Sequence, residues 1–360
     1  MTILSWIILG IFYAYGFFLL KITFVARKNK DKGAFINNLA NSITLLFSLS
    51  INTILLNCFN VTTLHFIIFP FDIFIIIFII VFFLTFYLLI KREKKKSLKS
   101  LKEKQSPLNF SNQEFPLKYD IYRKLSHLVV LGIIFFYFTL GSIIKNFFIY
   151  FLQNFPPIFS KLFFTLYNLE ENKMIFTQYL VVFLVGISLI GLLTADFVRI
   201  LKPQLFPLKP VNRILKEKEK YFRLGPHISM SIGCFSIIII YGIFQPIGPL
   251  IICTSMTISI FGDISSNLIG RRFGKKKIRN SNKTYIGLTA GIASGYFSGI
   301  ICLLLLQGSI HISVLYIFII PLIGSLLLGL IDYLDLEIDD NLTYNLFLSS
   351  VLFIISLFFL

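Results

Sequence analysis

Long apolar runs constrain the fold of this chain more than any other feature. The clearest run, at residues 69–90, reads FPFDIFIIIFIIVFFLTFYLLI. It reaches the roughly 20 apolar residues that cross ~30 Å of hydrocarbon, and similar runs recur along the sequence. Hydrophobic residues make up 56% of the chain, more than a soluble fold of 360 residues can bury. Because an alternating barrel pattern is absent, the runs predict an all-α, polytopic helical membrane protein.

Hydropathy predicts about ten transmembrane helices. They lie near residues 3–25, 35–58, 66–90, 126–143, 177–195, 227–244, 246–262, 285–306, 312–331 and 343–360. Basic residues orient them, because 30 of the 34 lysines and arginines fall within 27–32, 91–124, 199–223 and 271–283. The positive-inside rule predicts that these segments face the cytoplasm, at a cell membrane or the endoplasmic reticulum. The net charge of +17 is then a topology signal with attraction to anionic lipid, and nucleic-acid binding need not be invoked.

Composition divides the chain into three parts. Residues 1–90 are predicted to form a three-helix membrane module, and residues 91–119 a basic cytoplasmic linker. Residues 120–360 form a membrane domain that carries the unusual polar residues. Within it, residues 145–173 are apolar, but a crossing there would break the alternation of charge. We expect an interfacial or re-entrant element, interrupted at Pro156-Pro157.

Two constellations lie at predicted inner ends of spans. The first, YRKLSHLVV, contains Arg123, Lys124 and His127, which either anchor the span at the interface or take part in binding. The second, TADFVR, places Asp196 and Arg199 at helical i, i+3 spacing. Such a pair at the membrane boundary forms an ion pair or holds part of an anion site.

The most informative stretch, at residues 259–287, reads SIFGDISSNLIGRRFGKKKIRNSNKTYIG. Asp263 ends an apolar run, and Gly270 and Gly274 interleave with basic residues. Those basic residues are Arg271, Arg272, Lys275, Lys276, Lys277, Arg279 and Lys283. Glycine permits close backbone approach, and clustered cationic groups suit a polyphosphate. A Walker A pattern is missing. We interpret the stretch as a phosphate-handling loop, the alternative being a further positive-inside loop.

Acidic residues concentrate in LIDYLDLEIDDNLTYNL, which places five of the chain's 17 acids between Asp332 and Asp340. Asp339, Asp340 and Asn341 offer the hard oxygen ligands that Mg²⁺ prefers, and Mg²⁺ is usually shared with substrate phosphates. A solvated loop is the alternative, above all for Asp335 and Glu337. Read together with the basic stretch, the acids predict a lipid-alcohol kinase site at the cytoplasmic mouth of the bundle.

The order of these motifs, RKxxH, DxxR with a later Glu and Gly, GD…GRRFGK…KT…G and DDNLT, resembles the polyprenol kinase family. This family includes dolichol kinase, phytol kinase and CTP-dependent diacylglycerol kinase, and the resemblance covers about residues 120–350. It implies phosphorylation of a membrane alcohol by a nucleoside triphosphate, commonly CTP. The matching positions are Arg123, Lys124, His127, Asp196, Arg199, Glu219, Asp263, Gly270, Gly274, Lys283, Asp339, Asp340 and Asn341. Ile286 stands where the family commonly has an acid, and Asp332 where it has glutamate.

These positions suggest a division of roles. Lys283 with Arg271 and Arg272 is predicted to clamp phosphates, and the last acidic pair to hold Mg²⁺. Asp263 would either complete the metal site or accept the proton of the alcohol, and Asp196 is the other candidate for accepting that proton.

Two alternatives remain open. A CDP-lipid synthase acting on phosphatidic acid would also use CTP and Mg²⁺, but would release pyrophosphate rather than CDP. A transporter would show ionisable groups near mid-membrane and broken, repeated helices. No repeat is visible, and Asp72, near a span start, is the nearest acid to such a position.

Overall fold

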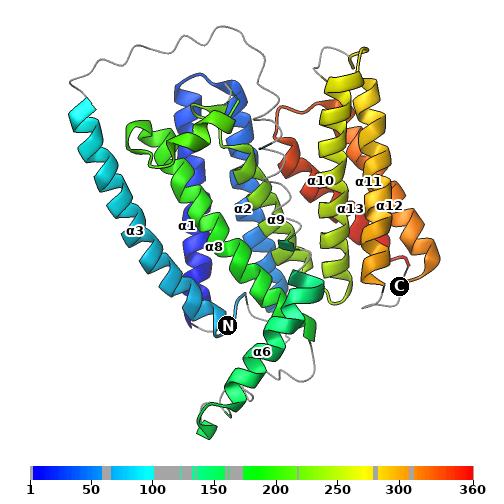
Figure 1. Ribbon diagram of the computed structural model, residues 1–360, viewed down its shortest axis with the longest axis horizontal. Helices are drawn as coiled ribbons and strands as arrows, with labels where there is room; N and C mark the ends of the chain where they lie inside the picture. The colour runs from blue at the N-terminus through cyan, green and yellow to red at the C-terminus, as the bar shows by residue number, and fades with distance from the viewer. Residues whose placement is uncertain are drawn as a thin grey trace.

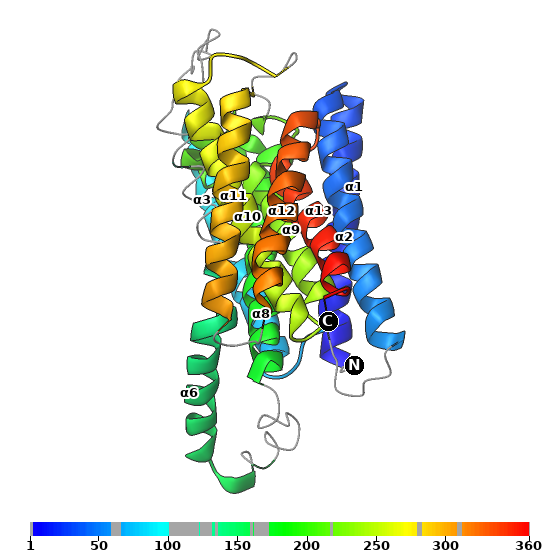
Figure 2. The same ribbon diagram turned by 90° about the vertical axis from the view of Figure 1, so that its right-hand side faces the viewer.

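The computed structural model describes residues 3–58, 66–100, 122, 132–133, 136–158, 161, 173–216, 219–278, 283–307 and 312–359. Over these residues the regular structure is helical, apart from one isolated bridge between Lys277 and Thr284. The long helices run side by side as one bundle (Figures 1 and 2). The predicted all-α membrane architecture is confirmed.

The helices follow the predicted runs closely. They are α1 (Ile3–Lys28), α2 (Lys32–Cys58), α3 (Phe71–Ser100), α6 (Gly141–Gln153), α8 (Lys173–Leu201), α9 (Pro226–Tyr241), α10 (Ile247–Phe273), α11 (Tyr285–Leu306), α12 (Val314–Leu334) and α13 (Asp340–Ser356). Within the described ranges, seven are long and apolar enough to cross a membrane: α1, α2, α3, α8, α10, α11 and α12. The predicted spans at 227–244 and 343–360 correspond to the shorter α9 and α13, of 16 and 17 residues. Most of the predicted span 126–143 lies outside the described residues.

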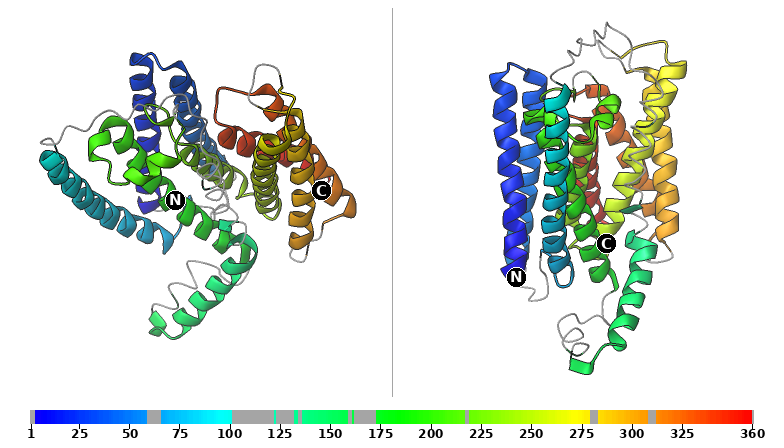
Figure 3. Two further views of the ribbon diagram at one scale, coloured as in Figure 1. Left: turned by 45° about the horizontal axis from the view of Figure 1, so that its top comes forward. Right: turned by 60° about the vertical axis from the view of Figure 1, so that its left-hand side comes forward.

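The predicted interfacial or re-entrant element, residues 145–173, overlaps α6. This helix follows a π-helical turn at Phe136–Leu140 and ends at Gln153, before Pro156. It projects from the end of the bundle where the chain's N-terminus lies (Figures 1 and 3). The helix therefore stops near the expected interruption. Its position at a membrane interface stays a prediction.

Helix α10 is the most deeply buried of the seven long apolar helices. In its most apolar window 83% of the residues are buried, against 11% in α3 at the margin (Figure 3). α9, α11, α12 and α13 all pack against α10. A large lipid-exposed surface, as on α3, is favourable only in a bilayer, which explains why α3 is almost wholly apolar up to its basic last turns.

The basic segments between helices gather at one end of the bundle, uppermost in Figure 1. We call it the basic end. It contains the ends of α1, α3, α8, α10 and α12 and the starts of α2, α9, α11 and α13. The described parts of 27–32, 199–223 and 271–283 lie there, as the alternation of charge predicts.

Buried amides on α2 join the first helices to the rest of the bundle. Asn38 donates to the carbonyl of Phe222 at 2.8 Å and accepts from the amide of Leu224 at 3.0 Å. Asn41 donates to the hydroxyl of Ser229 on α9 at 3.1 Å. Each such amide would be costly in hydrocarbon without a partner, so these bonds fix α2 against α9. A module of residues 1–90 that is functionally separate stays a prediction.

Candidate functional site

A pocket of about 580 Å³ opens at the basic end, among the ends of α10 and α12, the starts of α11 and α13 and the loop before α9. Among the described residues, seven acidic and four basic side chains line it. The acids are Glu219, Asp263, Asp332, Asp335, Glu337, Asp339 and Asp340. The bases are Lys216, Arg223, Arg271 and Lys283. In a chain that is strongly basic overall, this local excess of acid favours cations or ligands that carry them.

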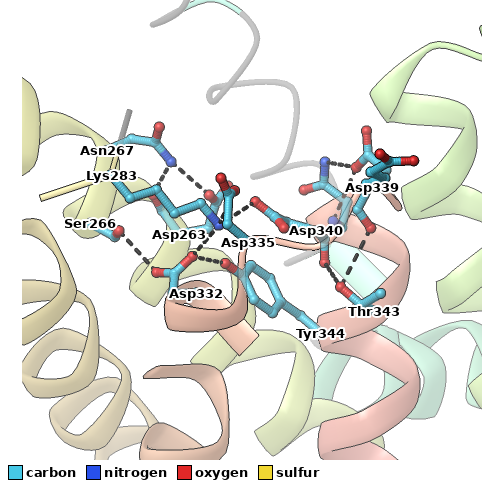
Figure 4. Close-up of polar contacts among 12 residues, drawn as sticks. Asp263, Ser266, Asn267, Lys283, Asp332, Asp335, Asp339, Asp340, Thr343 and Tyr344 are labelled. Carbon is cyan, nitrogen blue, oxygen red and sulfur yellow. Dashed lines mark hydrogen bonds and ion pairs between the residues drawn. The ribbon is translucent and has the colours of Figure 1, made fainter. Parts of the chain in front are cut away.

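Lys283 joins the basic stretch to the acidic one. Its Nζ lies 2.9 Å from Asp332 Oδ1, 3.0 Å from Asp340 Oδ2 and 3.5 Å from Asp335 Oδ1 (Figure 4). The contacts with Asp332 and Asp340 are charge-assisted hydrogen bonds, and the longer one with Asp335 is an ion pair. The two stretches, about 50 residues apart in sequence, therefore meet through one lysine.

Asp332 is the most enclosed of these partners, with a side chain only 4% exposed. Its Oδ1 also accepts a hydrogen bond from the hydroxyl of Tyr344, and its Oδ2 accepts one from Ser266 Oγ at 3.0 Å (Figure 4). Nearby, Asn267 Nδ2 donates to Asp263 Oδ1 at 2.7 Å. Hydroxyl and amide donors thus orient the buried carboxylates of Asp332 and Asp263.

Helix caps explain how the local sequence places the site residues. Thr284, beside Lys283, caps α11 by accepting from the amide of Gly287 at 3.2 Å. Asp339 caps α13 by accepting from the amide of Asn341 at 3.1 Å. Asp335 ends α12 with a left-handed backbone, φ 46°. Aspartate and threonine suit these positions, so capping and pocket formation use the same residues.

Burial and neighbouring charge shift two pKa values in the pocket. Burial raises the pKa of Asp340 to about 6; Lys283 opposes this, while Asp332, Asp263 and Asp339 add to it. Burial lowers the pKa of Lys283, but Asp340 and Asp332 outweigh that effect and leave it raised. Lys283 is therefore charged at neutral pH, and Asp340 gains a proton on mild acidification.

We expect Mg²⁺ binding to the pocket to weaken as the pH falls below about 6, because a protonated Asp340 no longer attracts a cation. Calorimetric titration of the purified protein between pH 5 and 8 measures this. An Asp340→Asn variant should bind more weakly and show a flatter profile; a profile identical to the wild type would exclude Asp340. Without a cation, the folded protein holds this proton more strongly than the unfolded chain, so stability should fall as the pH rises from about 4 to 6.

Asp196 and Arg199 form the ion pair that was one of their two predicted roles. Arg199 Nη2 lies 3.0 Å from Asp196 Oδ2, and Arg199 Nε donates to Asp196 Oδ1. Arg199 also donates to the carbonyls of Glu219 at 2.7 Å and Arg223 at 2.8 Å. Both side chains are buried and neither lines the pocket. The pair therefore shapes the loop before α9, and the geometry offers no support for its predicted contact with nucleotide.

The spaced glycines serve helix packing. A Cβ at Gly270 would lie 3.2 Å from Gly287 Cα, and one at Gly274 would lie 2.2 Å from Thr284 Oγ1. Gly291 of α11 faces Gly262 of α10 in the same way. These contacts let α10 and α11 approach closely. Gly270 lines the pocket, whereas Gly274 does not. Close helix packing is therefore an alternative explanation for both glycines, beside the contact with phosphate that was predicted for them.

The other predicted residues divide between the pocket and its surroundings. Asp263, Gly270, Arg271, Lys283, Glu219, Asp332, Asp339, Asp340 and Asn341 line the pocket. Arg272 does not line it and lies over the ring of Phe273. Arg123, Lys124 and His127 lie outside the described residues.

Several residues in or beside the pocket had no place in the predicted site. Ser266, Asn267 and Tyr344 orient the acids, and Arg223 lines the pocket wall. The spacing of Asn267 four residues after Asp263 is a usable helical signal. Arg223 carries no such signal, because it reads as one more basic residue of a cytoplasmic loop.

The pocket acids supply the hard oxygen atoms that Mg²⁺ prefers. Within the described part of the chain, however, no three His, Cys, Asp or Glu side chains are arranged so that they could hold a metal ion. Lys283 lies among the acids and balances part of their charge. Oxygen donors of the kind that Mg²⁺ prefers are therefore present, but the described side chains are not arranged as a ready metal site, and Mg²⁺ binding stays a prediction.

No protein-family model, curated protein or solved structure matches this chain. The site's own chemistry must therefore carry any functional assignment.

Proposed function

We propose that this protein is a lipid-alcohol kinase of the polyprenol kinase type, which transfers the γ-phosphoryl group of CTP to a dolichol-like polyprenol at the cytoplasmic face of its membrane. The observation that carries the proposal is the union of the basic glycine stretch and the acidic stretch around one pocket through Lys283. A cationic group held among carboxylates, beside further arginines, suits a phosphoryl group accompanied by Mg²⁺.

The pocket residues divide the chemical tasks. Asp339 and Asp340 are the acids proposed to hold Mg²⁺, which would offset the negative charge of the phosphates. Lys283 and Arg271 would bind phosphate oxygens. The alcohol oxygen would attack the γ-phosphorus, the bond to the β-phosphate oxygen would break, and CDP would leave. Asp263 lines the pocket and Asp196 does not, which favours Asp263 as acceptor of the alcohol proton.

The position of the pocket supports a membrane alcohol as acceptor. It opens where α10, α11 and α12 end or begin, and these helices are apolar enough to span a bilayer. A lipid hydroxyl at the interface can reach this level from the side, while a nucleotide arrives from water. Soluble acceptors would need no such placement.

A CDP-lipid synthase is the second candidate, because the acid-rich lining would equally suit Mg²⁺ and a leaving pyrophosphate. It would use phosphatidic acid and place the cytidyl group on the lipid.

One assay separates the two. Purified protein is incubated with Mg²⁺ and γ-labelled CTP, together with polyprenol, phytol, diacylglycerol or phosphatidic acid. Label in the organic phase, with CDP in the water, would support the kinase and identify its acceptor among the three alcohols. Labelled pyrophosphate released only with phosphatidic acid would favour the synthase. Neither product would contradict both proposals.

A further inference from the structure

The four basic residues of the pocket lining differ in how their charge is balanced. Lys283 has carboxylates within 3.0 Å on two sides. Arg223 is more enclosed, at 6% exposure, yet within the described residues no carboxylate lies within ion-pair distance of its guanidinium. A buried guanidinium without a counter-ion is costly, and a bound anion would offset that cost.

Two contacts hold Arg223 in place through one nitrogen. Its Nη2 donates to the carbonyl of Glu337 at 3.1 Å and to Asn37 Oδ1 at 3.4 Å. The same Asn37 oxygen accepts the amide of Asp339 at 2.9 Å. Asn37 of α2 therefore joins Arg223 to the start of the acidic pair.

The other two guanidinium nitrogens, Nε and Nη1, carry N–H groups that have no partner among the described residues. Nη1 lies 3.8 Å from the position that a Cβ would take at Gly33, which also lines the pocket. The missing side chain at Gly33 leaves this face of the guanidinium uncovered.

We propose that Arg223, positioned by Asn37, is a phosphate-binding subsite of the pocket. It would bind an anionic oxygen of a nucleotide or of a phosphorylated lipid, the acids and Mg²⁺ taking the rest of the charge. This proposal deepens the kinase assignment, and it gives a residue of the N-terminal helices a part in the site.

The test is binding, with pyrophosphate and short-chain phosphatidic acid as probes. Protein in neutral detergent, at constant Mg²⁺, is titrated calorimetrically with each probe. Arg223→Gln should weaken at least one probe about tenfold or more, since hydrogen bonds from a charged donor are lost. Arg27→Gln, which removes an exposed charge from the same end of the bundle, should leave both affinities unchanged. Loss with pyrophosphate points to a nucleotide phosphate, and loss with phosphatidic acid alone to a lipid phosphate.

The Asn37→Asp variant controls for the possibility that Arg223→Gln loses probe binding only because it misfolds. It keeps the size and the accepting oxygen, so the melting temperature should stay within about 3 °C of the wild type, but its carboxylate neutralises Arg223. The same loss of probe binding is expected. A purely structural Arg223 predicts wild-type affinity in this variant, and that result, or equal binding by Arg223→Gln, would overturn the proposal. So would a wild-type protein that binds neither probe.

The experiments can refute the Arg223 subsite and the kinase assignment independently of each other. Probe binding that depends on Arg223, without label transfer to any alcohol, would leave the subsite and remove the kinase. Label transfer with unaltered probe affinity in Arg223→Gln would leave the kinase and remove the subsite.

Discussion

Replacing Lys283 by methionine is expected to reduce phosphoryl transfer by about 10³-fold and to destabilise the protein by about 3–5 kcal/mol. Methionine keeps the apolar stem but removes the ammonium that lies between Asp332 and Asp340. Because the Asp332 side chain is only 4% exposed, its carboxylate would be left buried and unbalanced. Transfer of label from CTP and the melting temperature in detergent measure the two effects.

Lys283→Arg is the matched control, because it keeps the charge and should retain most of the stability. The double variant Lys283→Met with Asp332→Asn removes both charges together. It should recover much of the lost melting temperature without recovering activity, since the two residues are directly coupled. If Lys283→Met has the melting temperature and the activity of the wild type, the lysine neither stabilises the protein nor takes part in phosphoryl transfer.

Gly287→Val is the second change with a large expected effect, a destabilisation of about 3 kcal/mol or more with loss of the pocket. A Cβ at residue 287 would lie 2.6 Å from the carbonyl oxygen of Ser266 and 3.0 Å from Gly270 Cα. Both are backbone atoms, so neither can swing away. α11 would have to move off α10, and Lys283, directly before the cap of α11, would move with it.

Gly10→Val tests whether the effect is specific to the helix interface. A Cβ at Gly10 meets nothing within 4 Å, so the same substitution on α1 should change the melting temperature little. Detergent-solubilised yield, melting temperature and Mg²⁺ binding are compared for the two variants. Equal behaviour of both would contradict the close packing of α10 and α11.

The sequence was most informative where local pattern decides structure. The apolar run ending near residue 90 predicted α3, and the threonine and aspartate at residues 284 and 339 are recognisable caps once their helices are known. The charge alternation also predicted that the basic and acidic stretches share one end. What pattern cannot show is which side chains touch there.

Contacts between residues far apart in the sequence account for the features of the site that the sequence did not predict. Glycines such as Gly274 look alike whether they approach a phosphate or a neighbouring helix, and here the neighbour is Thr284. Asp332, at the position where the polyprenol kinase family commonly has glutamate, is the carboxylate most tightly enclosed around Lys283. Arg199 carries the same charge as Arg223, but only the packing of α8 against the following loop shows that its guanidinium is taken up by Asp196 and backbone carbonyls.

The bond from the amide of Asp339 to Asn37 has a consequence for the order of biosynthesis. Its two residues are separated by 302 positions, so Asn37 on α2 must wait until the start of α13 has been made before this corner of the pocket exists. A chain that has been translated only as far as α12 contains Asn37 and Arg223 but lacks Asp339 and Asp340. The pocket can therefore be complete only once the start of α13 has packed against α2.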